Sequence, residues 1–152
     1  DYGLQKYGPG APKMAQELAQ IDRVAGELID FYEQQGARVL IVSEYGISPV
    51  SRPVHLNRIL RQAGLLSIKD ELGRDGLDLF QSDAIAVADH QVAHVYLKNP
   101  ATLDAVKDLL AAVPGVDKVE YAYERWGPGI ALERAGDLIV TAAPDAWFTY
   151  YF

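Results

Sequence analysis

The chain has 152 residues, of which 49% are hydrophobic and 23% are charged, with a formal net charge of −7 and no cysteine. This length and composition indicate one soluble globular domain with a sizeable core. The excess of acidic residues argues against a nucleic-acid surface, no apolar run is long enough for a membrane span, and the lack of cysteine excludes disulfides and thiolate metal ligands. We therefore expect a cytoplasmic protein that binds neither nucleic acid nor a membrane.

The amino-terminal part is predicted to contain a loop, a helix and a strand. The opening stretch DYGLQKYGPGAP is rich in glycine, proline and tyrosine without periodicity, which predicts a loop. Apolar residues then recur every three or four positions from Met14 to Tyr32, which predicts a helix over Pro12–Gln35 closed by Gly36. The run VLIV predicts a strand over Ala37–Ser43 that is buried on both faces, as in a parallel sheet.

The middle of the chain is harder to interpret. Two prolines predict a loop over Ile47–Pro53, and a short helix is expected over Val54–Ala63, ending at Gly64. Apolar and charged residues then mix without a clean period up to Leu79, and only a short strand at Leu66–Lys69 is predicted.

The carboxyl-terminal half is predicted to be a small, largely antiparallel sheet with one covering helix. The expected elements are strands at Ala84–Ala88, Gln91–Leu97, Val116–Glu124 and Asp137–Ala142, and a helix that begins at Asn99–Thr102 and ends at Pro114-Gly115. The first two strands meet at Asp89-His90, which forms either a tight hairpin or a bulge within one strand.

These elements together predict an α/β fold with two parts in one domain. Residues 1–79 are expected to belong to a layered sheet with flanking helices, and residues 80–152 to form the smaller antiparallel sheet. In open α/β sheets, ligands collect at the carboxyl ends of the parallel strands. Glu44, directly after the predicted strand, therefore lies where a functional carboxylate is expected.

The two ends of the chain suggest a piece of a larger protein. Five of the last six residues, Trp147 to Phe152, are aromatic, and rings at this density normally pack against something. The chain also begins at Asp1 without a methionine. We expect a polypeptide trimmed at both ends, whose final aromatic residues contact either the missing part or a second copy of the chain.

Several polar residues have both a structural and a functional interpretation. Asp1 and Gln5 lie four positions apart in a glycine-rich loop, where such residues commonly stabilise turns. Glu44 and Tyr45 follow the predicted strand, where an acid also commonly caps a helix or pairs with an arginine. On residue patterns alone these alternatives stay open.

The three histidines favour structural roles. His90 and His94 share one face of a regular strand but lie about 13 Å apart along it, which is too far for one metal ion. His55 follows a proline in a predicted loop. The chain also lacks the motifs GxSxG, GxxxxGK[ST], HExxH and GxGxxG, so the mechanisms that depend on them have no support here.

The order of several short motifs resembles the type I phosphodiesterase and nucleotide pyrophosphatase family of the alkaline phosphatase superfamily. In that family a D-x-x-x-H-x-x-G-P loop precedes a long helix, a strand ends in S-D-H-G-M, and an L-N-x-x-L helix follows. This chain has DYGLQKYGP from Asp1, a helix containing Ile21-Asp22, SEYGI from Ser43, LNRIL from Leu56 and GLL from Gly64. The resemblance covers nearly the whole chain.

The resemblance implies a hydrolase of phosphate esters with two divalent metal ions (Zn, Mn or Mg) and a small-molecule substrate. Residues 1–79 would be the carboxyl-terminal part of the catalytic core, with Asp1 a ligand of one metal and Glu44 of the other. Gln5 and Tyr45 replace the family's histidines, and their oxygens favour a harder cation than zinc or a weakened site. The family's Ser or Thr nucleophile and its remaining ligands would lie outside this chain, so the fragment alone is expected to be inactive.

Two other interpretations remain at this point. Gln5 and Tyr45 are compatible with a degenerate member of the superfamily that has lost metal chemistry and serves as a binding or interaction module. Alternatively, the chain is a structural α/β domain in which Glu44 is a paired surface acid. Association of copies through the aromatic carboxyl-terminal segment fits each interpretation.

Overall fold

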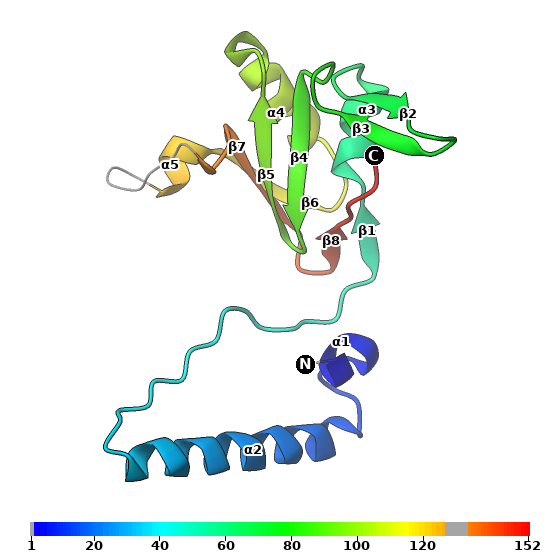
Figure 1. Ribbon diagram of the computed structural model, residues 1–152. Coiled ribbons are helices and arrows are strands. Elements are labelled where there is room, and N and C mark those ends of the chain that lie inside the picture. The colour runs from blue at the N-terminus through cyan, green and yellow to red at the C-terminus, as the bar shows by residue number, and fades with distance from the viewer. Residues whose placement is uncertain (1, 127–133) are drawn as a thin grey trace. The chain divides into compact units, whose positions relative to one another are not determined.

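A computed structural model describes residues 2–126 and 134–152 of the chain. The residues form two compact units, Asp1–Pro49 and Val50–Phe152, which are described separately (Figure 1). The division into residues 1–79 and 80–152 that the sequence suggests for the complete domain stays a prediction. Among the described residues, no helix has the length and apolar character needed to cross a membrane.

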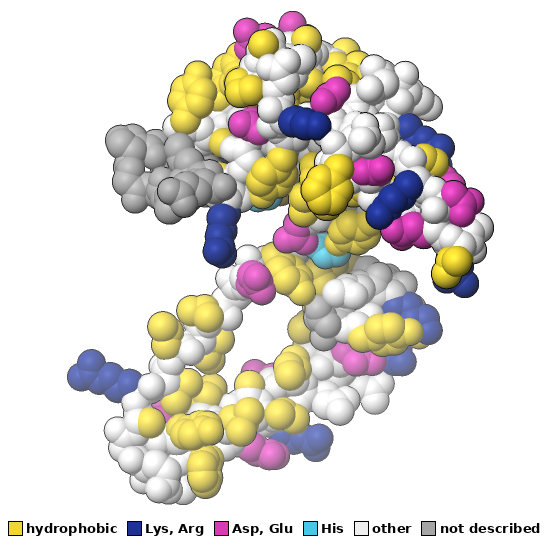
Figure 2. Space-filling model, turned by 45° about the horizontal axis from the view of Figure 1, so that its top comes forward, with side chains coloured by type: hydrophobic (Ala, Val, Ile, Leu, Met, Phe, Trp, Pro, Cys, Tyr) yellow, Lys and Arg dark blue, Asp and Glu magenta, His cyan; other side chains and the backbone are white. Residues whose placement is uncertain are grey.

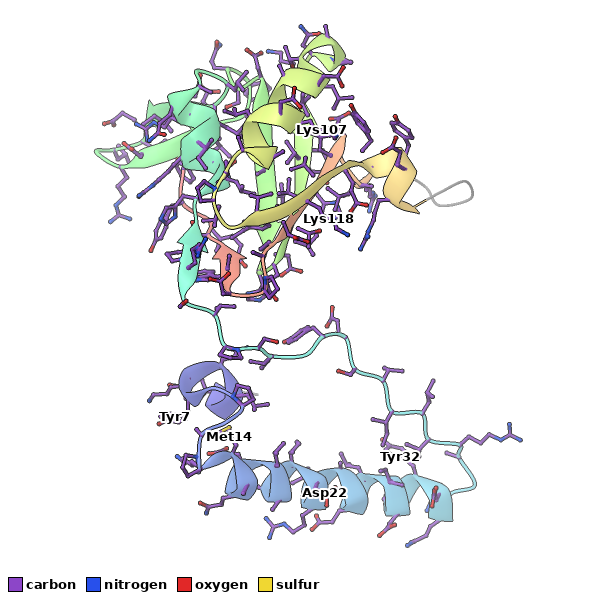
Figure 3. The ribbon with its side chains drawn as sticks, turned by 180° about the vertical axis from the view of Figure 1, so that it is seen from behind. Tyr7, Met14, Asp22, Tyr32, Lys107 and Lys118 are labelled. Atoms are coloured by element: carbon purple, nitrogen blue, oxygen red, sulfur yellow. The ribbon has the colours of Figure 1, made fainter. Side chains whose placement is uncertain are left out.

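The first unit is built on the predicted long helix, α2, which spans Met14–Gln34. Its end is as predicted, because Gly36 adopts a φ of +78°, a left-handed conformation that favours glycine. The opening stretch is not the predicted loop but a short helix, α1, over Tyr2–Tyr7. Gly3 of α1 is buried beside the start of α2. A Cβ on Gly3 would lie 3.2 Å from Met14 Cε and 3.2 Å from Glu17 Cδ. The missing side chain lets α1 pack against the start of α2, near Tyr7 and Met14 in Figure 3.

The predicted strand at Ala37–Ser43 is wrong for this structure, in which the segment is extended but not part of a sheet. The side chains of Leu40, Ile41 and Val42 are 84%, 74% and 79% exposed. A strand is defined by hydrogen bonds to a neighbouring strand, and no described strand pairs with this segment. An apolar run with β-forming residues is therefore present without the partner that would make it a strand.

The second unit contains three small sheets. Its elements are β1 Arg52–Val54, α3 Leu56–Gln62, β2 Ser67–Asp70, β3 Asp75–Asp78, β4 Ala84–Asp89, β5 Val92–Leu97, η1 Pro100–Thr102, α4 Leu103–Ala111, β6 Val116–Tyr121, α5 Ala122–Trp126, β7 Leu138–Ala142 and β8 Ala146–Phe148. The largest sheet has the order β4-β5-β7-β6 and is antiparallel throughout. The strands β2 and β3 form an antiparallel pair, and β1 and β8 form a parallel pair (Figure 1).

The antiparallel sheet confirms the prediction for residues after 80. The strands β4 and β5 form a hairpin, and His90 in its turn adopts a φ of +54°. Asn99 begins the helical segment as predicted, because its side chain accepts a hydrogen bond of 3.0 Å from the N–H of Ala101. The predicted strand over Val116–Glu124 is shorter than expected, since the chain turns into α5 after Tyr121.

The elements that the sequence patterns miss are short. The strands β1, β3 and β8 have three or four residues each, and β1 occupies part of the predicted loop over Ile47–Pro53. A run of three residues is too short to show the alternation of buried and exposed side chains, so β1 and β8 are recognised only by the strands they pair with. The predicted short helix and the strand near Leu66–Lys69 are confirmed as α3 and β2.

The hydrophobic core lies on one face of the antiparallel sheet. Along β4 the alternate residues Ala84, Ala86 and Ala88 are buried, and their small side chains let the helices approach the sheet closely. Leu56 and Leu60 of α3 are buried in the same core, as are Val106 and Leu110 of α4. The alternation of buried and exposed positions thus decides which face of the sheet the helices cover.

Asn57 of α3 joins this helix to the edge of the sheet. Its Nδ2 donates a hydrogen bond of 2.8 Å to the carbonyl oxygen of Ala86, and its Oδ1 accepts one of 2.8 Å from the N–H of the same residue. Ala86 lies in the edge strand β4, so the side chain of Asn57 takes the place of a neighbouring strand at this residue. Only 7% of Asn57 is exposed, so both bonds are formed away from water.

Tyr121 connects β6 to α4. Its hydroxyl donates a hydrogen bond of 2.6 Å to Asp104 Oδ1, and Lys107 Nζ lies 4.6 Å from its ring centroid (Lys107 in Figure 3). The ring of Tyr123 stacks on that of Tyr121, with centroids 5.4 Å apart. The pKa of Tyr121 is raised to about 12, mainly because Asp104 holds the phenolic proton in this hydrogen bond.

We predict that Asn57→Ala lowers the free energy of unfolding by about 2–4 kcal/mol, because the N–H and carbonyl of Ala86 lose their partners in a buried place. Asn99→Ala is the matched control, since Asn99 caps an exposed helix end through one bond, and about 1 kcal/mol is expected. Urea unfolding followed by circular dichroism measures both. Equal losses for the two variants would contradict the role assigned to Asn57.

Gly115→Ala is expected to be more harmful than Gly64→Ala. Both glycines have positive φ, +97° and +76°, but only Gly115 lacks room for a side chain, since a Cβ there would lie 2.7 Å from Val54 Cγ2. We expect Gly64→Ala to cost about 1–2 kcal/mol of unfolding free energy from backbone strain. Gly115→Ala should cost about 1–3 kcal/mol more because Val54 must move. Thermal unfolding of the two variants makes the comparison, and equal melting temperatures would refute it.

Asp104→Asn should bring the pKa of Tyr121 from about 12 toward its ordinary value of 10.0. The folded state then binds this proton less tightly, so its stabilising contribution changes with pH. In the unchanged protein that contribution is fully present below pH 10.0 and is lost as the pH rises toward about 12. Nuclear magnetic resonance titration of the Tyr121 ring carbons measures the shift. An unchanged pKa in the variant would show that Asp104 is not its cause.

Candidate functional site

Glu44 and Tyr45 lie in the extended stretch that follows α2. Both side chains are exposed, and the backbone bends at Glu44. Ser43 Oγ donates a hydrogen bond of 2.9 Å to the carbonyl oxygen of Tyr45, which spans the bend at Glu44. The carboxylate of Glu44 is therefore presented on the surface of the first unit, where a dissolved cation can reach it.

Gln5 lies in α1, and its side chain is exposed. Because Gly3 of the same helix packs on Met14 and Glu17, α1 is fixed against the start of α2. Gln5 is thus placed by a packed helix pair rather than by the loop that the sequence predicts. The amide oxygen of Gln5 is a suitable ligand for a hard cation but a poor one for zinc.

The complete predicted ligand set is not assembled in the described part of the chain. Asp1 lies outside the described residues, so its predicted role has no geometry. Among residues 2–126 and 134–152, no three histidine, aspartate or glutamate side chains gather closely enough to hold a metal ion. Of the four predicted ligands, the described residues therefore supply three donors: the carboxylate of Glu44, the amide of Gln5 and the phenol of Tyr45. The set Asp1, Gln5, Glu44 and Tyr45 stays a prediction.

The donor chemistry of these three residues fits a hard divalent cation. A carboxylate, an amide and a phenol all offer oxygen, which Mg²⁺ and Mn²⁺ accept more readily than Zn²⁺ does. All three side chains are exposed. One carboxylate gives weak affinity by itself, so a tight site needs further acidic ligands.

Two of the three histidines, His94 and His55, make hydrogen-bond contacts of the structural kind that the sequence favours. His94 Nδ1 lies 2.8 Å from the carbonyl oxygen of Ala135, and the half-buried ring packs on the outer face of the sheet. His55 Nδ1 lies 2.7 Å from Thr149 Oγ1, which links the start of α3 to the end of the chain. His90 lies in the β4–β5 turn, with its Nε2 3.8 Å from Asp89 Oδ1.

The aromatic carboxyl-terminal segment is partly absorbed by the second unit. Phe148 of β8 is fully buried, and β8 pairs with β1 in parallel. Tyr150 and Tyr151 remain exposed, with the Arg58 guanidinium 5.2 Å from the ring centroid of Tyr151. Part of this segment therefore belongs to the core. Contact between copies of the chain stays a prediction, and Tyr150 and Tyr151 are the exposed residues that could make it.

The motif LNRIL has a structural explanation that the sequence alone does not supply. Leu56 and Leu60 are buried in the core, and Asn57 binds the backbone of Ala86. The leucine spacing signals a helix face, but a buried asparagine gives no sequence signal of the strand it binds. This motif therefore positions α3 against the sheet.

Comparison with known protein families matches residues 1–152 to the family described as type I phosphodiesterase / nucleotide pyrophosphatase. No curated protein matches the chain. Solved structures do match it, and the identities of about a fifth show likeness of fold alone.

Murine ectonucleotide pyrophosphatase / phosphodiesterase 5 is 20% identical with a TM-score of 0.61, and the match covers 99% of this chain and 37% of that one. Phosphonoacetate hydrolase from Sinorhizobium meliloti 1021, in complex with phosphonoacetate, is 21% identical with a TM-score of 0.66. This match covers 97% of this chain and 36% of the hydrolase. The same hydrolase in complex with phosphonoformate is 20% identical with a TM-score of 0.65, and the match again covers 97% of this chain and 36% of the hydrolase.

The chain thus spans little more than a third of the length of these structures. Its mixed α/β structure, with a small parallel pair and a four-stranded antiparallel sheet, corresponds to part of their fold. The family match extends over every residue of the chain, including the motifs at Glu44 and Leu56. The chain therefore belongs to the type I phosphodiesterase / nucleotide pyrophosphatase family.

Proposed function

We propose that this chain supplies part of the catalytic domain of a metal-dependent hydrolase that acts on phosphate esters or anhydrides. The observation that carries the proposal is the family match over residues 1–152 together with an acidic residue, Glu44, exposed after the extended segment. The matching structures are much longer than this chain, which supports a role as one portion of a larger domain. In that domain, Ala37–Ser43 would be a strand of the layered sheet.

In this proposal Asp1 and Glu44 are ligands of two different metal ions, with Gln5 and Tyr45 as further donors. Two cations about 3.5–4 Å apart supply electrostatic stabilisation to an in-line displacement at phosphorus. The backbone bends at Glu44, and Glu44 is exposed, so its carboxylate is accessible to a cation. The packing of Gly3 on α2 holds the helix that bears Gln5. The nucleophile and the remaining ligands come from outside this chain, so the chain alone is inactive.

The substrate in this proposal is a small phosphorus-containing anion. One of the matching proteins is a phosphonoacetate hydrolase whose structures contain phosphonoacetate and phosphonoformate, which supports a compact ligand. The net charge of −7 would repel such an anion, so the bound cations must offset that repulsion locally. Because Gln5, Glu44 and Tyr45 offer only oxygen, Mn²⁺ or Mg²⁺ is preferred to Zn²⁺.

A second candidate function is a binding or interaction module without metal chemistry. Gln5 and Tyr45 favour it, because both stand where the family pattern has histidine and both are weaker ligands. The two candidates differ in one measurable property, which is binding of divalent cations at Glu44.

We predict that a polypeptide containing this chain within a complete family domain hydrolyses a chromogenic phosphodiester in a Mn²⁺-dependent manner. Chelation should abolish the activity, and Glu44→Ala should lower kcat/KM on the order of 100-fold or more, since even residues around a metal's direct ligands cost 10–100-fold. Glu44→Asp restores the family pattern and should keep activity within about tenfold. Glu27→Ala, which removes an exposed acid of α2, is the matched control and should have no effect.

Metal affinity separates the two candidates independently of turnover. Replacing Gln5 and Tyr45 together by histidine should increase Zn²⁺ affinity in calorimetry, because imidazole is a better zinc ligand than an amide or a phenol. Absence of divalent cation binding by the complete domain, with normal folding, would eliminate the hydrolase proposal and leave the binding module.

A further inference from the structure

The start of α3 and the aromatic carboxyl-terminal segment meet in the second unit. The N–H of Thr149 donates a hydrogen bond of 2.9 Å to the carbonyl oxygen of Val54, directly after the parallel pairing of β8 with β1. This places Tyr151 beside α3. Its ring centroid lies 5.9 Å from that of His55 and 5.2 Å from Arg58 Cζ. The proposed metal centre uses none of these side chains.

Thr149 orients the ring of His55. Its Oγ1 lies 2.7 Å from His55 Nδ1, and only 3% of Thr149 is exposed. We assign this hydroxyl as the donor, because it has no other hydrogen-bond partner among residues 2–126 and 134–152 and a buried O–H seldom stays unpaired. In the neutral ring the proton then resides on Nε2, which faces away from Thr149. A protonated ring also carries an N–H at Nε2, so His55 presents a donor there in either state.

Arg58 supplies further donors on the same turn of α3. Its backbone N–H donates a hydrogen bond of 3.1 Å to the carbonyl oxygen of His55, and side chains three positions apart in a helical turn are neighbours. The guanidinium lies over the ring of Tyr151, a contact that leaves its N–H edge available to an anion. Arg52 and Arg61 each have an aspartate partner, whereas Arg58 forms no ion pair within the described part of the chain.

The overall charge of the chain does not attract anions, so an anion site must be built by particular neighbours. The net charge is −7, and Figure 2 shows acidic and basic side chains interspersed on the visible face of the second unit. A guanidinium binds phosphate or carboxylate oxygens through two parallel N–H bonds. A neighbouring imidazole N–H adds a third donor, and three donors match the several oxygens of a tetrahedral anion.

We propose that His55, Arg58 and Tyr151 form a binding site for a small phosphorus oxyanion, such as phosphate or the phosphonate end of a larger molecule. Arg58 binds two oxygens, Nε2–H of His55 binds a third, and the ring of Tyr151 supports the guanidinium. Thr149 is a positioning residue that acts through His55. The site needs no metal ion, because its donors are all N–H groups of the protein.

The first test follows the histidine rings by nuclear magnetic resonance, since the chain has only three histidines. Inorganic phosphate, added at constant pH and ionic strength with a chelator present, should shift the ring signals of His55 along a saturating curve. His90 and His94 are internal controls in the β4–β5 hairpin and should not follow that curve. Acetate should bind more weakly because it carries fewer charges and oxygens. Equal, non-saturating shifts of all three rings would indicate an adventitious ion only and overturn the proposal.

The second test changes Arg58. Arg58→Gln should raise the dissociation constant for phosphate roughly 10–100-fold, because charge-assisted hydrogen bonds are lost. Arg58→Lys keeps the charge without the paired N–H groups and should recover only part of this loss. Arg74→Gln lowers the positive charge equally in the hairpin between β2 and β3 and is the matched control, with no effect expected. An unchanged dissociation constant in Arg58→Gln, with the circular dichroism of the folded protein, would overturn the proposal.

The third test removes the orienting hydroxyl. Thr149→Val keeps the size of the side chain and the charge of the site, and it should raise the dissociation constant for phosphate roughly 2–10-fold because the ring of His55 is no longer held. His55→Gln removes the imidazole from a half-buried position and should weaken binding even if Thr149→Val does not fold. Full phosphate affinity in His55→Gln would overturn the proposal.

The same titration in a complete family domain that contains this chain shows whether the site persists there. We expect phosphate to shift His55 in that protein too, with a chelator present to empty the proposed metal centre. No response of His55 in the complete domain would overturn the proposal, since other parts of the domain would then occupy the cluster. Chelation should abolish hydrolysis without changing this binding, so the failure of either proposal can be recognised separately.

Discussion

Hydrogen bonding between strands is the constraint on which this structure depends. A strand's N–H and C=O groups must find partners, and where a partner is present the chain forms a sheet. In the second unit every strand of the four-stranded sheet has a neighbour, and Asn57 supplies one at the edge where no strand is available. In the first unit the run at Val39 pairs with no strand in residues 2–126 or 134–152 and is exposed.

The two units differ in how far their apolar side chains are buried. The second unit buries its apolar residues between the sheet and the helices α3 and α4, and its small alanines in β4 make that contact close. The first unit consists of one long amphipathic helix with a short helix against its start, and much of its apolar surface is exposed. Such a surface is typical of a part that is completed by other polypeptide.

The candidate ligands Gln5, Glu44 and Tyr45 all lie in the first unit. Glu44 lies at a bend that a Ser43–Tyr45 hydrogen bond spans, and Gln5 lies on a packed helix, so the local contacts around each are short-range. In the proposed two-metal centre, Asp1 and Glu44 bind different cations, and further parts of a family domain would bring these residues together. The family match and the fold likeness to much longer structures both point to that larger context.

The sequence by itself determined the local elements whose signals are periodic or conformational. The three-and-four spacing of apolar residues defined α2, Gly36 ended it, and the alternation around Ala86 and Val95 defined the β4–β5 hairpin, because these patterns follow from the geometry of a single helix or strand. The order of short motifs also determined the family. It identified Glu44 as a candidate ligand only through that resemblance and its place after an apolar run.

Only the tertiary structure decided which segments found partners. The strands β1 and β8 are too short to show a pattern, and they exist because residues almost a hundred positions apart meet in parallel. The helix α1 replaced a predicted loop because Gly3 packs against Met14 and Glu17. The predicted strand at Val39 pairs with no strand of the described residues, since strand formation depends on a neighbour that a residue pattern does not contain.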